Sequence, residues 1–429
     1  MSEQQTFTKC AWRLIPLMGL LYAVNFVDRV NVGFAALTMN KDLDFSPSVY
    51  GFGAGVFFLS YFLFQVPANW MLLRLGARRW VFCILALWGL ISASHVFVQG
   101  TWSFYALRFL LGAAEAGFMP GMLLYMSYWF PQAYLARYTA MFQTAIPISF
   151  VIGGPLASLI LRMDGVGGLH GWQWLFLLEG IFPFLLSFAV LRLLPDSPAR
   201  ASWLSREEKD NIGRHLASDA AAEQRGFWLA FRDPRVFVLG FVLFGQAIGG
   251  LYGVGLWLPQ IVRTMGVSNE ATGFIVAIPY VVGVPVMILW GRSSDLKRDR
   301  IWHIAIALLL AAGSFFVASA AHNDLVVFTA LGLTAVCAVS IAPPLNSLVK
   351  SILTGAAAAG GIAIYNSIGN LGGFVGPYII GALNEKSGGY GSSMAVLASV
   401  LVLAAVTIIA FGRIMALRAP AGQAKHTAA

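Results

Sequence analysis

Long apolar runs alternate with short polar segments from one end of the chain to the other. Each run has the roughly 20 residues that an α-helix needs to cross the hydrocarbon core of a membrane. The pattern therefore predicts an all-α polytopic membrane protein with twelve transmembrane helices. The predicted spans cover residues 12–36, 49–73, 79–98, 102–128, 138–161, 172–194, 235–262, 271–291, 301–321, 325–349, 358–384 and 391–413.

One long polar segment interrupts this alternation between the sixth and seventh runs. Within it, "SREEKDNI" predicts a short surface helix capped by Ser205. The chain then divides into an N-terminal six-helix bundle (1–195), a linker (196–232) and a C-terminal six-helix bundle (233–429).

An internal repeat supports this division. "NWMLLRLGARR" (69–79) follows the second run and "GRSSDLKRDR" (291–300) follows the eighth, at an offset of 222 residues. The same offset relates "GGP" (153–155) to "VGP" (375–377). Large transporters often contain such repeats, so the two bundles are expected to be pseudo-symmetric.

Composition and charge agree with a membrane protein. Hydrophobic residues make up 58% of the chain and charged residues only 11%, against about 25% in soluble domains. Twenty-two of the 28 Lys and Arg residues lie on one set of alternate loops and ends, and four lie on the other set. By the positive-inside rule both termini and the linker face the cytoplasm, so the net charge of +9 reflects topology and indicates no nucleic-acid partner.

The sequence contains no pattern typical of an enzyme or a cofactor site. Its three cysteines are far apart, which indicates neither a disulfide framework nor a metal site. The six histidines lie near span ends or in loops, and no phosphate-binding loop is present. We therefore expect no cofactor, no bound metal and no catalytic residues.

The first span contains two adjacent charges, Asp28 and Arg29. Each costs about 2.5 to 3.5 kcal/mol at the centre of a membrane helix on insertion scales, so both need compensation. Tyr22 and Asn25 recur before them at spacings of three and four, which places these polar residues along one helix face. That face is predicted to point into the bundle.

The fourth span repeats this arrangement. Arg108, Gly112 and Glu115 lie at i, i+4 and i+7, again on one face, and Gly112 permits a close neighbouring helix. Offset by 222 residues, the second half has no matching buried charges. The charges of the first and fourth spans are therefore expected to line one polar cavity near the middle of the membrane.

The residue types suggest two different roles in that cavity, anion binding and proton exchange. Arg29 and Arg108 keep their charge and suit an anionic substrate, whereas carboxyl groups such as Asp28 and Glu115 can exchange protons in a partly dry site. The alternative is that these residues only form ion pairs that hold the two helices together. Glu179 lies near two tryptophans at the start of the sixth span and is interpreted as a structural hydrogen-bonding group.

The second half contributes neutral polar residues. Gln246 lies in the seventh span, and Asn366 and Asn370 lie at i and i+4 in the eleventh. These amides, and Tyr61 in the second span, either contact a ligand or join neighbouring helices.

Several longer motifs resemble the major facilitator superfamily and, within it, the anion:cation symporter family. The resemblance covers nearly the whole chain. Within the family, the sequence is similar to bacterial permeases for tartrate, phthalate, 4-hydroxyphenylacetate and sugar acids. Its motifs are "FVDRVNVGFAALTM", "GARRW", "RFLLGAAEAGFMPGMLLYMSYWFP", "GWQWLFLLEG" and "YNSIGNLGGFVGP".

The resemblance implies the major facilitator fold and proton-coupled import of an organic anion. It implies that Asp28 and Glu115 are the protonation sites and that Arg29 and Arg108 manage substrate charge. It further implies that four polar residues contact the substrate, namely Tyr61, Gln246, Asn366 and Asn370.

The expected protein is thus a transporter of a small hydroxy, aromatic or sugar acid in a bacterial inner membrane, functional as a monomer. An exporter of drugs or metabolites with the same fold is the first alternative. A membrane enzyme or receptor is the second, and the sequence contains no catalytic triad, metal cluster or large extramembrane domain that would support it.

Overall fold

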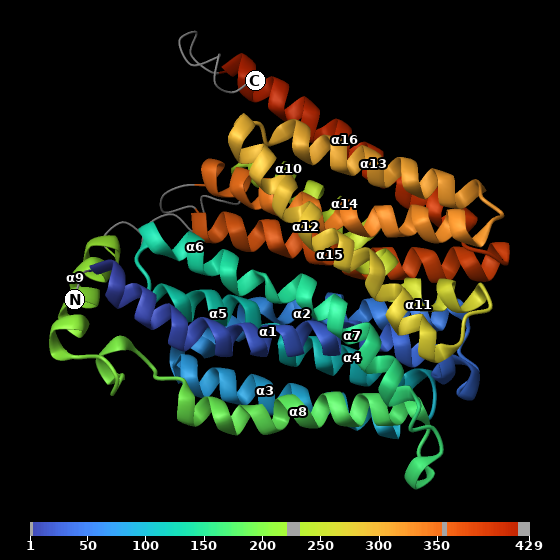
Figure 1. Cartoon of the computed structure of the whole chain (residues 1–429), viewed down its shortest axis with the longest axis horizontal. Coiled ribbons are helices and arrows are strands. Elements are labelled where there is room, and N and C mark those ends of the chain that lie inside the picture. The colour runs from blue at the N-terminus through green and yellow to red at the C-terminus, as the bar shows by residue number, and fades with distance from the viewer. Residues whose placement is uncertain (1–2, 221–231, 354–357, 419–429) are drawn as a thin grey trace.

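The computed structural model describes residues 3–220, 232–353 and 358–418. Throughout these residues the regular structure is helical, and the helices form two bundles that lie side by side (Figure 1). Residues 221–231 of the predicted linker and the C-terminal residues 419–429 lie outside the described residues.

The N-terminal bundle contains the helices up to α8, and the C-terminal bundle contains those from α10 onward. The first comprises α1 (Glu3–Asp42), α2 (Pro47–Leu75), α3 (Ala77–Ala93), α4 (Thr101–Glu115), α5 (Phe118–Ser127), α6 (Gln132–Gln143), α7 (Ala145–Leu161) and α8 (Gly171–Leu193), with the short helices η1 (Ser94–Phe97) and η2 (Val166–Gly168). The second comprises α10 (Pro234–Gln246), η5 (Ala247–Val254), α11 (Gly255–Thr264), α12 (Asn269–Lys297), α13 (Ile301–Ala320), α14 (Asp324–Ile352), α15 (Ala358–Ser387) and α16 (Gly391–Arg418).

The prediction of twelve membrane-crossing helices is confirmed. Eleven helical segments of the described residues are long and apolar enough to span a membrane. The twelfth is α15, whose many glycines and three asparagines lower its hydropathy. It packs against α2. The fourth and fifth crossings each consist of two consecutive helices, and the seventh contains the π-helical stretch η5 between two α-helices.

The internal repeat corresponds to two equivalent contacts between the bundles. Gly51 of α2 lies against α15, where a Cβ atom added to it would be 2.5 Å from the backbone oxygen of Pro377. Gly273 of α12 lies against α7, where an added Cβ would be 2.1 Å from the oxygen of Gly154. Gly51 and Gly273 are separated by the same offset of 222 residues as the "GGP" and "VGP" motifs that they contact.

Both contacts lie toward the end of the molecule where α2 begins and α15 ends, which we call the distal end. Polar contacts also join the bundles there. Arg162 and Glu270 form an ion pair of 3.2 Å. The Glu385 carboxylate accepts hydrogen bonds from the Ser46 hydroxyl at 2.8 Å and from the Ser48 backbone N–H at 3.0 Å. The distal end is therefore closed by contacts from both bundles.

The opposite end, which we call the linker end, carries α9 (Arg206–Ala220) beside the start of α1 (Figure 1). Ser205 and Glu208 cap α9 reciprocally: the Ser205 N–H donates to Glu208 Oε2 at 2.7 Å, and the Glu208 N–H donates to Ser205 Oγ at 3.2 Å. The predicted surface helix and its cap are thus confirmed. Lys9 Nζ lies 2.9 Å from both Glu208 oxygens, and this contact joins the linker helix to the N-terminal bundle.

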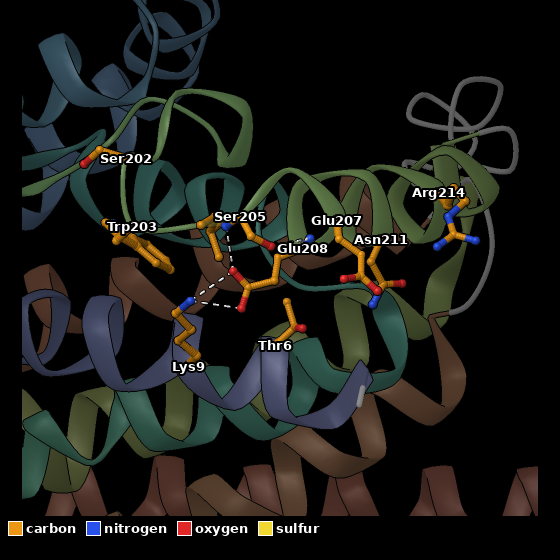
Figure 2. Close-up of a pocket in the computed structure, with 10 residues that line it drawn as sticks. Thr6, Lys9, Ser202, Trp203, Ser205, Glu207, Glu208, Asn211 and Arg214 are labelled. Atoms are coloured by element: carbon orange, nitrogen blue, oxygen red, sulfur yellow. Dashed lines mark hydrogen bonds and ion pairs between the residues drawn. The ribbon is translucent and has the colours of Figure 1, made fainter. Parts of the chain in front are cut away.

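Figure 2 shows a pocket of about 610 Å³ between α1 and α9. Trp203 forms one of its walls and stacks on Trp129 with ring centroids 5.6 Å apart, while Arg13 lies over the Trp203 ring at 5.5 Å. These contacts connect the linker to the N-terminal bundle. The pocket is lined by Thr6, Lys9, Ser202, Trp203, Leu204, Ser205, Glu207, Glu208, Asn211 and Arg214.

Candidate functional site

The centre of the N-terminal bundle contains a buried ion pair between α1 and α4. Arg29 Nη2 lies 2.9 Å from Glu115 Oε2, and the Asn25 amide donates to the same oxygen at 2.7 Å. Asn25 and Arg29 are one turn apart and therefore face the same neighbour. The second carboxyl oxygen, Oε1, is buried and has no hydrogen-bond partner in the described part of the chain.

Aromatic rings surround the Arg29 guanidinium. Its central carbon lies 5.1 Å from the ring centroid of Phe26, 5.2 Å from that of Phe57 and 5.0 Å from that of Tyr61. A guanidinium over ring faces is stabilised by the negative potential of the π-systems. Arg29 also donates to the Tyr252 hydroxyl at 3.5 Å, and Tyr252 belongs to η5 in the other bundle. This arginine is thus contacted from both halves of the protein.

Asp28 faces a different helix from its neighbour Arg29. Its Oδ2 accepts from the Trp88 indole at 2.6 Å, and its Oδ1 accepts from the Asn31 amide at 3.1 Å and from the Ser92 hydroxyl. Trp88 and Ser92 lie on α3, so neutral donors rather than an arginine hold this carboxylate. The alternative in which these residues only form ion pairs between α1 and α4 therefore does not apply to Asp28, because adjacent helix positions point about 100° apart.

Arg108 is buried against α2. Its Nε donates to the backbone oxygen of Gly53 and its Nη2 to that of Ala54, both at 3.3 Å, and its central carbon lies 4.9 Å from the Phe57 ring centroid. Its remaining nitrogen, Nη1, has no partner among the described residues. Arg108 is close enough to both predicted acids of the site to interact with their charges, but it forms no direct ion pair with either in the described structure.

A glycine allows this close approach of α4 and α2. A Cβ atom added to Gly112 would lie 2.0 Å from the backbone oxygen of Phe57. The sequence prediction that Gly112 admits a close neighbour is confirmed.

The neutral residues predicted in the second half lie on helices that face the interior. The Gln246 amide donates to the Ala338 backbone oxygen of α14 at 2.6 Å, and its own oxygen is buried without a partner in the described residues. Asn366 and Asn370 are half-buried on α15. Gln246 thus joins two helices, and a role for these amides in substrate binding stays a prediction.

The sequence alone assigns no role to four of the contacting residues: Asn25, Tyr252, Trp88 and Ser92. Asn25 has a sequence signal, because it precedes Arg29 by four positions on one face. Tyr252 lies in the glycine-rich run "GGLYGVG", and π-helical turns of this kind are frequent at functional sites. For Trp88 and Ser92, the α3 partners of Asp28, the only sequence pattern is a polar residue one turn after a tryptophan.

Comparison with known proteins identifies the family. The model of the Major Facilitator Superfamily matches residues 18–377 and 261–428. The chain is 44% identical over 414 residues to a protein of Agrobacterium vitis named for tartrate transport, covering 96% of this chain and 95% of that one. It is 38% identical over 418 residues to a quinolone resistance transporter of Acinetobacter baumannii, covering 96% of both chains.

Solved structures support the same fold. A D-xylose-proton symporter superposes with a TM-score of 0.75 at 19% sequence identity, covering 92% of this chain and 97% of that one. Family model, relatives and fold agree along nearly the full length. The chain therefore belongs to the major facilitator superfamily of membrane transporters.

Proposed function

We propose that the protein is a proton-coupled secondary transporter that imports a small organic carboxylate by alternating access. The observation that carries this proposal is the buried Arg29–Glu115 pair, in which one guanidinium meets an acid of its own bundle and the Tyr252 hydroxyl of the other. The relative named for tartrate transport supports an organic acid as substrate. The protein acts as a monomer in a bacterial inner membrane, with both termini and α9 in the cytoplasm.

The chemistry of the pair couples protons to substrate. While Glu115 is ionised it neutralises Arg29, and Oε1 is the oxygen without a donor that can accept a proton. Once Glu115 is protonated, the guanidinium is left without a counter-ion and binds an incoming carboxylate through charge-assisted hydrogen bonds. Arg108, with one free nitrogen, is the second cation available to the substrate, and Asp28 is the second protonation site.

Substrate binding then biases the conformation. A ligand shifts an equilibrium only if it interacts differently with the two states. Arg29 already reaches Tyr252 across the bundle interface, so replacing Glu115 by a substrate anion changes a contact between the bundles. Tyr61, Gln246, Asn366 and Asn370 complete the substrate contacts. Release at the linker end and loss of the protons re-form the ion pair.

The test is uptake by purified protein in liposomes under an inside-alkaline pH gradient. L-Tartrate is the first probe, followed by aromatic, hydroxy and sugar acids, with a fluorescent pH indicator inside the vesicles. We expect one acid to accumulate together with protons. Glu115→Gln keeps an acceptor for Arg29 but cannot ionise, so it should lose gradient-driven accumulation and keep substrate exchange. The matched control is Glu207→Gln, which removes an exposed acid on α9.

Full gradient-driven accumulation by Glu115→Gln would refute the coupling mechanism. The second candidate function is drug export, which the quinolone resistance relative favours. In that case the vesicles would accumulate none of the acids, and inverted vesicles would take up a quinolone in exchange for protons.

A further inference from the structure

Glu179 is a buried acid that the proposed mechanism does not use. It lies on α8 with 7% of its surface exposed, and neither carboxyl oxygen has a hydrogen-bond partner among the described residues. The next residue, Gly180, packs directly on α3, where an added Cβ would lie 2.3 Å from the Ala93 nitrogen. Ala93 follows Ser92, which holds Asp28. The α8 backbone beside Glu179 therefore lies against the turn of α3 that contains Ser92.

The buried charges of the described spans do not balance if every group is ionised. Three carboxyl groups are buried there, those of Asp28, Glu115 and Glu179, against the guanidinium groups of Arg29 and Arg108. A net charge in a low-dielectric interior is costly, and a buried group without a partner neutralises instead. Glu115 has a guanidinium and Asp28 has three donors, whereas Glu179 has neither. The proton that would balance these charges therefore belongs on Glu179.

Asn31 offers an acceptor for that proton. Its Nδ2 donates to Asp28 at 3.1 Å, while its Oδ1 is buried and has no donor in the described residues. α1 packs against α8, and Asn31 and Asp28 of α1 lie near enough to Glu179 to act on its charge. A neutral Glu179 has an O–H that can donate to Asn31 Oδ1, whereas a carboxylate can only accept. One proton thus satisfies both groups and fixes the orientation of the amide that holds Asp28.

Among the described residues, His95 is a further titratable group near this site, in η1 next to α8. Its Nδ1 lies 3.0 Å from the Ile91 oxygen and 3.1 Å from the Ser92 oxygen, and its ring stacks on Phe176 of α8. Its other nitrogen is buried without a partner in the described structure, so a second proton would leave an unsatisfied N–H. His95 is therefore neutral and supplies no counter-charge. The neighbouring helix α7 contains no titratable residue.

We propose that Glu179 is kept as a neutral carboxylic acid that positions Asp28 by donating a hydrogen bond to Asn31. It is a positioning residue that retains its proton through the transport cycle. Only the effect on transport rests on the proposed function; the protonation state does not.

Infrared spectroscopy of the purified protein in lipid tests the protonation state without any substrate. At neutral pH the wild-type protein should show the C=O stretching band of a protonated carboxyl group that Glu179→Gln lacks. Glu207→Gln, which changes an exposed and ionised acid, should retain it. Identical spectra for the wild type and Glu179→Gln would overturn the proposal.

Transport assays distinguish a positioning role of Glu179 from a role in proton transfer. The Gln side chain keeps an N–H donor for Asn31, so Glu179→Gln should accumulate L-tartrate, or whichever acid the screen identifies, within twofold of wild type and with an unchanged proton-to-substrate ratio. Glu179→Met has no donor and should lower accumulation at least tenfold. A lost or altered proton ratio in Glu179→Gln would overturn the proposal, because it would mean that the proton moves.

The experiments distinguish failure of the proposed transport function from failure of the proposal on Glu179. If no acid accumulates in wild-type vesicles, the proposed function fails while the infrared difference still reports on Glu179. If Glu179→Met does not fold, the spectrum and the retained activity of Glu179→Gln decide the matter.

Discussion

Arg29 and Glu115 form a direct ion pair inside the membrane region, with Nη2 and Oε2 2.9 Å apart. Both side chains are almost completely buried. Removing one partner of such a pair leaves an uncompensated charge in a poorly solvated interior. The pair thus links α1 to α4 electrostatically.

The first prediction concerns the energy of this link. Glu115→Leu and Arg29→Met should each lower the free energy of unfolding by about 3 to 5 kcal/mol, and the double variant should lose much less than their sum. Thermal unfolding of the purified protein measures the effect. Asp28→Leu combined with Arg29→Met is the control pair and should show a smaller coupling, because Asp28 bonds to α3. Additive losses for Arg29 and Glu115 would contradict the prediction.

The second prediction concerns closure of the distal end. Alanine at Gly51 or Gly273 would place a Cβ 2.5 Å or 2.1 Å from a backbone oxygen of the opposite bundle, so the bundles must separate there. A cysteine introduced for Asn40, in a background without Cys10, Cys83 and Cys337, reports the opening. Its labelling by a membrane-impermeant maleimide should become at least about tenfold faster, which corresponds to roughly 1.4 kcal/mol.

Gly19→Ala is the matched control for that experiment, because an added Cβ at Gly19 meets no atom within 4 Å. It should leave the labelling rate unchanged. Equal rates for Gly51→Ala and Gly19→Ala would show that these glycines do not limit closure.

The third prediction concerns the pH dependence of the linker contact. Burial acts to raise the pKa of Glu208, but the Ser205 N–H and the Lys9 ammonium outweigh it and hold the pKa below its ordinary value. The contact should therefore stabilise the fold fully above the ordinary pKa of about 4.3 and lose its effect as pH falls through the lower, folded-state pKa. Its contribution should be about 1 kcal/mol or less, because Lys9 is partly exposed.

The measurement is the difference in melting temperature between the wild type and Glu208→Gln across a pH series. The difference should be constant from about pH 7 down to pH 5 and should shrink below that. Glu207→Gln, one residue away and exposed, should show no such change. A difference that grows on acidification would contradict the assigned sign.

Much of the fold follows from sequence alone because membrane crossing is a local property. A run of apolar residues predicts a helix without reference to its neighbours, and even α15 could be recognised despite Asn366, Asn370 and its glycines. The repeat predicted that the halves correspond, and the equivalent contacts of Gly51 and Gly273 bear this out.

The pairing of the charges could not be predicted in the same way. Spacing places Asn25 and Arg29 on one face, and both do contact Glu115. Spacing does not say which helix lies opposite each face, and Asp28, one position earlier, meets α3 instead of α4. Gln246 illustrates the same limit, since its amide bonds to a helix more than ninety residues later in the chain.

The matching contacts of Gly51 with Pro377 and of Gly273 with Gly154 also bear on the origin of the chain. A half-length ancestor with one such glycine and one such motif would have made the same contact twice, as an isologous homodimer with a two-fold axis. Gene duplication and fusion would then preserve both contacts in a single polypeptide. The buried acids and arginines, present in the first half alone, mark where the two descendants of that ancestor diverged.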